Sequence, residues 1–256
     1  MSKKRIMKSL GLIVVAGLAI GINVVGYQKS RQDQYDQRVA QAMSSIKNQA
    51  EQIDKIQASL NATLLSANTA FLRPDLTLEE LDKIETEINQ LKVSAADFSV
   101  EVNDLPKESL TFATKKDDLK NQHQVLVSKL RIEEAIRTFF EAETLDWQTV
   151  ETNAAINDTV TLEQLKEVQE DVTRIPEDQW QQNMTSYLDL AQEQLETVAN
   201  VQAFVDTMLV DGQVTDAATY GNYLELDYQV NQIASNSWRA QLKQAVDAIA
   251  TQIGLY

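Results

Sequence analysis

The sequence predicts an all-α protein, with an N-terminal transmembrane helix followed by an elongated tandem array of three-helix-bundle modules. Three observations predict this class. Glycine and proline are scarce, at seven and three of 256 residues, which disfavours folds that need many tight turns. Apolar residues recur at spacings of three and four, the period of an amphipathic helix. One long stretch also matches the chain 58 residues later.

The N-terminal segment predicts a membrane anchor. Residues 1–9 carry four basic residues and no acid, and residues 10–26 carry no charge. At about 1.5 Å per residue, the uncharged run reaches about 26 Å, slightly less than the hydrocarbon core of a bilayer. Either residues 10–27 form an uncleaved single-pass helix with a cytoplasmic N-terminus, or they are a secretory signal cut after Gly26. The long helical pattern that follows without a break favours the anchor. Both interpretations place residues 28–256 outside the cytoplasm.

Charge changes sign after this segment. The rest of the chain has 19 basic and 38 acidic residues, a formal charge of −19. Such a field repels nucleic acid, so we expect no nucleic-acid partner. The chain has no Cys and one His, which excludes disulfides and Cys-ligated metals and leaves little for a multi-His metal site. We expect no cofactor and no metal.

The next segment predicts one long helix. Residues 28–44 are poor in apolar side chains and are typical of a helical stalk. A 4-3 apolar stripe then follows, typical of a coiled coil or a long bundle helix. Its members are Val39, Met43, Ile46, Ala50, Ile53, Gln57, Leu60, Leu64, Ala67 and Phe71. We expect this helix to stop at Arg73-Pro74-Asp75, because proline removes a backbone donor. Residues 39–71 either pack within the chain or pair two copies as a homodimer.

The internal repeat predicts two helical hairpins. A shift of 58 residues superposes Thr161 on Thr219, and the apolar spacing then stays in register. The repeat anchors are Val172, Ile175 and Trp180 in one copy and Val230, Ile233 and Trp238 in the other. Each copy is expected to form helix, short turn and helix, with the tryptophan closing the end of the hairpin.

An earlier copy begins at Thr77, whose sequence TLEEL is similar to TLEQL at Thr161. A competing register aligns residues 102–106 with 172–176, so an insertion is expected between residues 92 and 104. A hairpin buries only one face and needs a third helix to pack against. We expect the segment before each hairpin to supply it, because the last helix of one module continues into the next as a long helix near 107–142 and near 177–210. The expected modules are residues 45–129, 130–195 and 196–256.

Each repeat combines an Ala/Phe-rich helix, a loop such as Val210–Thr215, a helix that starts at Thr, and a Val-x-x-Ile-x4-Trp/Leu pattern. In these features the repeats resemble extracellular helical modules of Gram-positive surface proteins such as the mid-cell-anchored protein Z family, which marks division sites. It covers about residues 45–254 and implies a link to cell division. That family carries a substantial cytoplasmic region, whereas about nine residues precede the hydrophobic segment here, so the cytoplasmic partner is not carried over.

Residues that could carry chemistry are few. Trp147, in the long loop 143–160, is our candidate for contact with a partner. His123 is expected to be a bundle-edge residue, and Asp211-Gly212 a turn between helices. Pairs of acids could serve a glycosidase only if a cleft brought them together, and we expect them on solvated helix faces. These pairs are Glu79-Glu80, Asp117-Asp118, Glu133-Glu134 and Glu170-Asp171.

The expected function is therefore non-enzymatic. We predict a membrane-anchored extracytoplasmic scaffold or adaptor of the bacterial cell envelope, with a protein or cell-wall partner outside the cell. The alternative is a ligand-sensing ectodomain, or a secreted binding protein released by signal cleavage.

Overall fold

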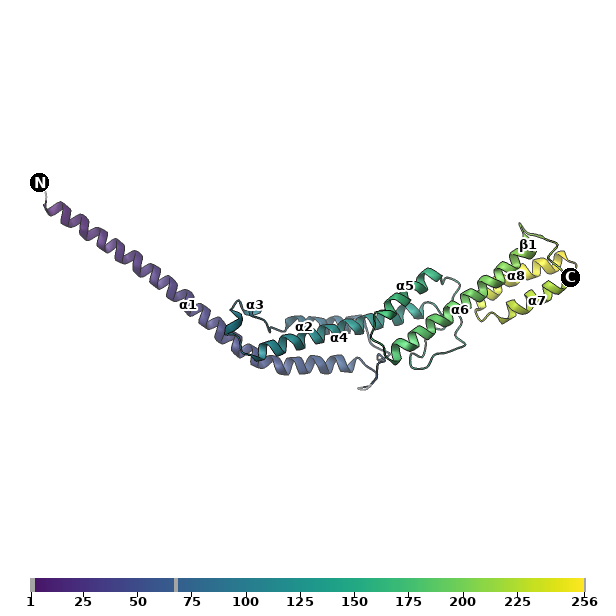
Figure 1. The fold of residues 1–256 in the computed structure, drawn as a ribbon, viewed down its shortest axis with the longest axis horizontal. Coiled ribbons are helices and arrows are strands. Elements are labelled where there is room, and N and C mark those ends of the chain that lie inside the picture. The colour runs from purple at the N-terminus through teal and green to yellow at the C-terminus, as the bar shows by residue number, and fades with distance from the viewer. Residues whose placement is uncertain (1–2, 67–68, 256) are drawn as a thin grey trace. The chain divides into compact units, whose positions relative to one another are not determined.

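The computed structural model describes the backbone of residues 3–66 and 69–255 and the side chains of residues 29–66 and 69–255. The chain is mostly helical there (Figure 1). Its elements are α1 (Lys3–Ala62), α2 (Leu78–Gln90), α3 (Ala95–Phe98), η1 (Val102–Asp104), α4 (Glu108–Arg137), α5 (Leu162–Thr173), α6 (Gln179–Met208), β1 (Leu209–Val210), β2 (Gln213–Val214), α7 (Tyr220–Gln232) and α8 (Asn236–Gln252). The predicted all-α class is confirmed, apart from one two-stranded hairpin.

The expected membrane helix at residues 10–27 lies outside the residues whose side chains are described. Within the described part of the chain, no helix is both long enough and apolar enough to cross a bilayer.

The chain divides into two compact units. Unit 1 comprises residues 1–59 and 83–121, and unit 2 comprises residues 60–82 and 122–256. In unit 1, the Tyr35 hydroxyl of α1 donates to Asp104 at 2.5 Å and accepts from the Glu101 amide at 2.8 Å. Lys116 of α4 donates to the Leu91 carbonyl just after α2. Polar side chains thus fix the segment between α2 and α4 at both of its ends.

The buried face of α1 differs from the predicted stripe. The structure buries Ala42, Ile46, Gln49, Ile53, Ile56 and Leu60, which again alternate by four and three. Ile46, Ile53 and Leu60 are common to both sets, but Met43 is 44% exposed and Ala50 and Gln57 are half-buried. Both sets satisfy the heptad spacing, so the spacing alone does not decide which alternate positions are buried. The predicted burial of Met43, Ala50 and Gln57 was wrong, because the structure buries Ala42, Gln49 and Ile56 instead.

The predicted continuation of α1 to Arg73 was also wrong, because the helix ends at Ala62. The hydroxyl of buried Thr63 donates to the Leu60 carbonyl at 2.7 Å, and such bonds compete with the helix ladder. Beyond it, Leu64 bridges Leu72 in antiparallel fashion. Phe71 joins the core of unit 2 from this loop instead of from a helix. Ala67 lies outside the described residues.

One hydrogen-bond pattern occurs three times in unit 2. After each long helix the chain turns back, and a backbone amide returns to a carbonyl near the helix end. These bonds are Arg73 N–H to Thr63 at 2.9 Å, Asn157 N–H to Phe139 at 2.9 Å and Thr215 N–H to Met208 at 3.0 Å. In the third copy the returning chain forms β1 and β2, around Asp211 and Gly212 with φ of 49° and 75°. Glycine and Asp tolerate this left-handed conformation, and Asp-Gly favours hairpin turns.

Four residues after each returning amide stands a threonine that caps the next helix. Its hydroxyl accepts from the backbone amide three residues on. The pairs are Thr77 and Glu80, Thr161 and Gln164, and Thr219 and Asn222, at 3.2 to 3.3 Å. This geometry satisfies an amide that the helix itself leaves unpaired. Of the two registers that the sequence left open for the first copy, the structure therefore supports the one that begins at Thr77.

The expected insertion also lies between the two helices of the first copy. Only a short turn separates α5 from α6 and α7 from α8, whereas residues 91–107 separate α2 from α4. This longer segment contains α3, which Ser94 and Asp97 cap reciprocally, and the single turn η1. The competing match at residues 102–106 falls within this inserted segment.

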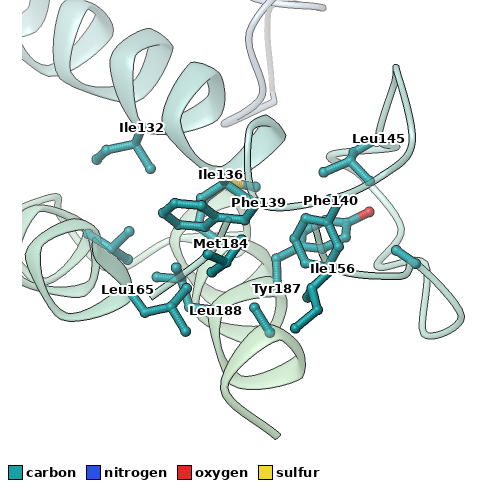
Figure 2. Close-up of a cluster of buried hydrophobic side chains, with 14 of the residues drawn as sticks. Ile132, Ile136, Phe139, Phe140, Leu145, Ile156, Leu165, Met184, Tyr187 and Leu188 are labelled. Carbon is teal, nitrogen blue, oxygen red and sulfur yellow. The ribbon is translucent and has the colours of Figure 1, made fainter. Parts of the chain in front are cut away.

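Two buried clusters in unit 2 each draw on three helices. The first joins the end of α4, α5 and the first half of α6; Figure 2 shows Ile136, Leu165 and Met184 meeting there. The second joins the second half of α6, α7 and α8, and includes Val205, Val230 and Val246. Since α6 contributes buried residues up to Ala191 to one cluster and from Val198 to the other, it connects both cores.

A carboxylate ties the loop after α4 to the start of α8. Glu141 Oε1 accepts from the Ser235 hydroxyl at 2.9 Å and from the Asn236 amide at 2.9 Å. Burial alone would raise the pKa of Glu141, but these bonds, with those from Ser237, outweigh it and lower the pKa. An anion is favourable at the positive end of a helix dipole. Glu141 therefore fastens the start of α8 to the loop after α4 through a charged group.

Candidate functional site

A cavity of about 370 Å³ lies in unit 2, between the loop after α1, the end of α4 and the loop 143–148. Its lining mixes apolar and charged side chains. The apolar members include Phe71, Leu72, Leu76, Leu130 and Leu145, and the charged members are Arg73, Glu133, Glu134, Arg137, Glu143 and Asp146. Its volume lies near the lower end of the range for small-ligand sites, and its lining is more charged than the lining of most such sites.

Glu133 is the most unusual member of this lining. Its side chain is only 4% exposed, and its Oε1 accepts a 2.7 Å hydrogen bond from Trp180 Nε1. Burial raises the pKa of Glu133 to about 7, although the Trp180 bond and the charges of Arg137 and Lys129 oppose this shift. The carboxyl group therefore changes its charge near neutral pH.

The sequence did not predict this residue. We expected the pair Glu133-Glu134 on a solvated face, and the prediction is wrong for Glu133 but correct for Glu134, which is exposed. The signal was present in the spacing: Glu133 stands three residues before Ile136 and four after Lys129, on the face that Ile136 buries. Two charged residues on one apolar face indicate a buried polar cluster more than a solvated face.

Lys129 holds the other charge of this cluster. It is almost fully buried, and its Nζ donates to Asp178 at 2.6 Å and to the Ala70 carbonyl at 2.9 Å. The ammonium also lies 4.7 Å from the centroid of the Trp180 ring. A buried ammonium needs such partners. Asp178 is itself the N-cap of α6, so Lys129 joins the start of α6 to the loop after α1.

The two arginines of the lining differ in their partners. Arg73 forms ion pairs with Asp75 at 2.5 Å and with Glu80 at 2.6 Å. Arg137 lies with its guanidinium carbon 5.9 Å from the centroid of the Trp147 ring, and among the described residues it forms no ion pair within 4 Å. The cavity therefore contains one guanidinium that is neutralised locally and one that rests on an aromatic face.

Trp147, the predicted partner contact, lines this cavity. Its ring is half-buried and meets Tyr187 edge-on at 5.6 Å. Asn183 of α6 donates to its backbone carbonyl at 2.8 Å. The loop that carries Trp147 is thus held on the core while one side of the indole lines the cavity. Its role as a contact stays a prediction.

The repeat anchors occupy equivalent places with unequal burial. Val172, Ile175 and Trp180 belong to the first cluster, and Val230 and Ile233 to the second. Trp180 is fully buried, whereas Trp238 is half-buried and contacts both clusters. The Trp238 Nε1 atom is buried without an acceptor among the described residues, while Trp180 Nε1 bonds Glu133.

The remaining candidates have structural surroundings. His123 is 8% exposed, and its Nε2 lies 2.9 Å from the Leu81 carbonyl, so it is packed more deeply than the expected bundle edge. Asp211 and Gly212 form the hairpin turn. Within the described ranges, no three acidic or histidine side chains are grouped so that they could hold a metal ion.

Comparison of the chain with protein-family models, with curated proteins and with solved structures finds no match.

Proposed function

We propose that this chain is a non-enzymatic, membrane-tethered scaffold of the bacterial cell envelope, built as an elongated tandem array of three-helix-bundle modules outside the cytoplasm. The observation that carries the proposal is that α6 belongs to two successive three-helix clusters. A shared helix passes the end of one module directly into the next, which is how repeat proteins extend without a flexible linker.

Three features support a spacer or docking role. Thr77, Thr161 and Thr219 begin equivalent hairpins, so the units are repeats of one design. Glu141 and Lys129 fasten successive hairpins with charged hydrogen bonds. The acid excess of the chain keeps such an array soluble and repels anionic surfaces. The resemblance to modules of the mid-cell-anchored protein Z family adds a link to cell division or wall binding to this proposal.

The tether rests on residues 1–27, with their basic flank and uncharged run. The experiment expresses the full chain with a C-terminal tag in a Gram-positive bacterium. We expect the tag in the membrane pellet, and we expect protease added to intact protoplasts to remove it. A variant lacking residues 10–26 serves as the control and should stay in the cytoplasm, protected. A tag protected in the parent chain overturns the proposed topology.

Mass spectrometry of the mature N-terminus separates the two forms of export. An intact N-terminus supports the anchor, whereas a chain that starts near Tyr27 supports the secreted binding protein. Sedimentation of the purified full chain in detergent with isolated cell-wall material tests the docking role directly, since a scaffold of the wall should co-sediment with it.

The cavity beside Glu133 favours the second candidate, a ligand-sensing ectodomain. A ligand that binds the folded chain but not the unfolded chain raises the melting temperature of the protein. A ligand-dependent rise, together with retention in the membrane, supports sensing by the same tethered chain.

A further inference from the structure

We propose that the Gln202 side chain has a second position, in which its Oε1 accepts a hydrogen bond from Trp238 Nε1 and its amide group closes an apolar groove of unit 2. In the structure this amide group instead donates to Asp206 Oδ1 at 2.8 Å. The inference does not depend on the proposed scaffold function, because it concerns a contact between α6 and α8 within the folded chain.

The repeat places Gln202 where the first cluster has Glu133. The carbonyl that receives the returning amide belongs to Phe139 after α4 and to Met208 at the end of α6. Six residues before these carbonyls stand Glu133 and Gln202. Glutamine has the length and shape of glutamate, and its side-chain carbonyl is a hydrogen-bond acceptor. Since the two repeat tryptophans are equivalent as well, Gln202 is the expected acceptor for the second of them.

A neighbouring position changes together with this one. Ten residues before the same carbonyls stand Lys129 and Val198, and both are buried. Around the first cluster the Lys129 ammonium lies 4.7 Å from the centroid of the Trp180 ring, on the same helix as Glu133. A buried carboxylate without a nearby cation is costly, whereas a neutral amide needs no such partner. Val198 and Gln202 are therefore the uncharged counterpart of Lys129 and Glu133.

The described position of Gln202 leaves a donor without a partner. Trp238 Nε1 is buried and has no acceptor among the described residues. A buried donor without an acceptor costs more free energy than an exposed side-chain pair four residues apart on a helix contributes. Gln202 and Asp206 are such an exposed pair. The exchange of their bond for a bond to Trp238 is therefore favourable.

A groove of about 300 Å³ in unit 2 provides room for the second position. Gln202 and Trp238 both line it, together with Leu162, Leu195, Glu196, Val198 and Ala199. Trp238 contacts both buried clusters. A bond between Gln202 and Trp238 therefore ties α6 to α8 where the two cores meet, and it covers apolar surface that the described position leaves open.

The experiment records the indole N–H resonances of the full chain in nanodiscs of zwitterionic lipid, assigned with W180F and W238F. Q202M keeps the length of the side chain but removes its acceptor, whereas D206A removes the competing partner of the amide. Because a hydrogen bond deshields its proton, we expect the Trp238 resonance to move upfield in Q202M and downfield in D206A. Exchange of this proton with deuterium should be about three- to tenfold faster in Q202M than in the parent chain.

A matched control is available on α1, where Gln32 donates to Asp36 at 3.0 Å in an equally exposed pair. Q32M should leave all three indole resonances in place, and Q202M should leave the Trp180 resonance in place. Circular dichroism tests whether each variant keeps its helix content. An unchanged Trp238 resonance in Q202M, or movement in the same direction in Q202M and D206A, overturns the proposal.

Discussion

The indole Nε1 of Trp180 and the carboxyl group of Glu133 form a 2.7 Å hydrogen bond in which both side chains are buried. A tryptophan that the repeat spacing predicts as a closing residue of a hairpin thus also satisfies the most deeply buried acid beside the cavity. The core and the candidate site share this contact, so changes to either residue should affect both stability and titration.

The first prediction concerns pH. The pKa of Glu133 is raised from 4.5 to about 7 in the folded state, so the folded chain binds this proton more tightly than the unfolded chain. The stabilisation is full below about pH 4.5 and is lost as the pH rises to about 7, a change of about 3 kcal/mol in the free energy of unfolding. Urea unfolding of the parent and of E133Q from pH 4.5 to 8 measures this change in the free energy of unfolding.

The glutamine variant should lack this component, and E134Q, which changes the exposed neighbour, should keep it. An identical pH slope in the parent and in E133Q would show that Glu133 does not titrate in this range.

The second prediction compares the two repeat tryptophans. W180F removes the donor to buried Glu133 as well as ring volume, and should cost about 2–4 kcal/mol. W238F removes an N–H that has no acceptor among the described residues, and should cost about 1 kcal/mol. Chemical denaturation of the two variants checks the order. Equal losses would mean that the Glu133 bond adds little to stability.

The third prediction concerns the helix caps. T77A, T161A and T219A each remove a hydroxyl that accepts from a first-turn amide, and each should cost about 1 kcal/mol. Serine at the same positions should restore most of it. T197A, in the middle of α6, where the hydroxyl only donates to the preceding turn, is the matched control. A comparable loss there would refute the capping role.

The fourth prediction concerns the contact at the start of α8. E141A removes the acceptor of the Asn236 amide, so this amide should exchange with solvent about tenfold faster by hydrogen exchange. Amides in the middle of α5 should be unaffected. Because the pKa of Glu141 is lowered, protection in the parent chain should also weaken as the pH falls below about 4.5. Unchanged exchange in E141A would assign the protection to burial alone.

Apolar spacing predicted the helices that carry the repeat. The hairpins from Thr161 and Thr219 follow their expected limits closely, because local periodicity and a threonine cap agree there. The α4 and α6 helices end earlier than expected, at Arg137 and Met208, since apolar residues continue past them into the bridged loops. A pattern of apolar residues alone cannot distinguish a helix from a returning strand that faces the same core.

The cavity was less predictable. Trp147 was chosen for its place in a long loop, and the structure puts it in the lining. Glu133 was missed because an acid pair on a helix is usually solvated. The spacing to Lys129 and Ile136 places Glu133 on the buried face, but its hydrogen bond to Trp180, which is 47 residues away, leaves no local signal. Arg73 was interpreted only as part of a helix stop, whereas its ion pairs depend on the turn that follows Ala62.

The division of α6 between two cores also determines how this part of the protein should come apart. If the cluster around Met184 unfolds, the first half of α6 loses the packing that holds it. The second half of α6, which contains Val205, then begins at an unfolded segment instead of at a helical turn. Neither bundle can therefore be lost without weakening the other. Under a pulling force applied to the two ends of this part of the chain, the two bundles should unfold in one step instead of in sequence.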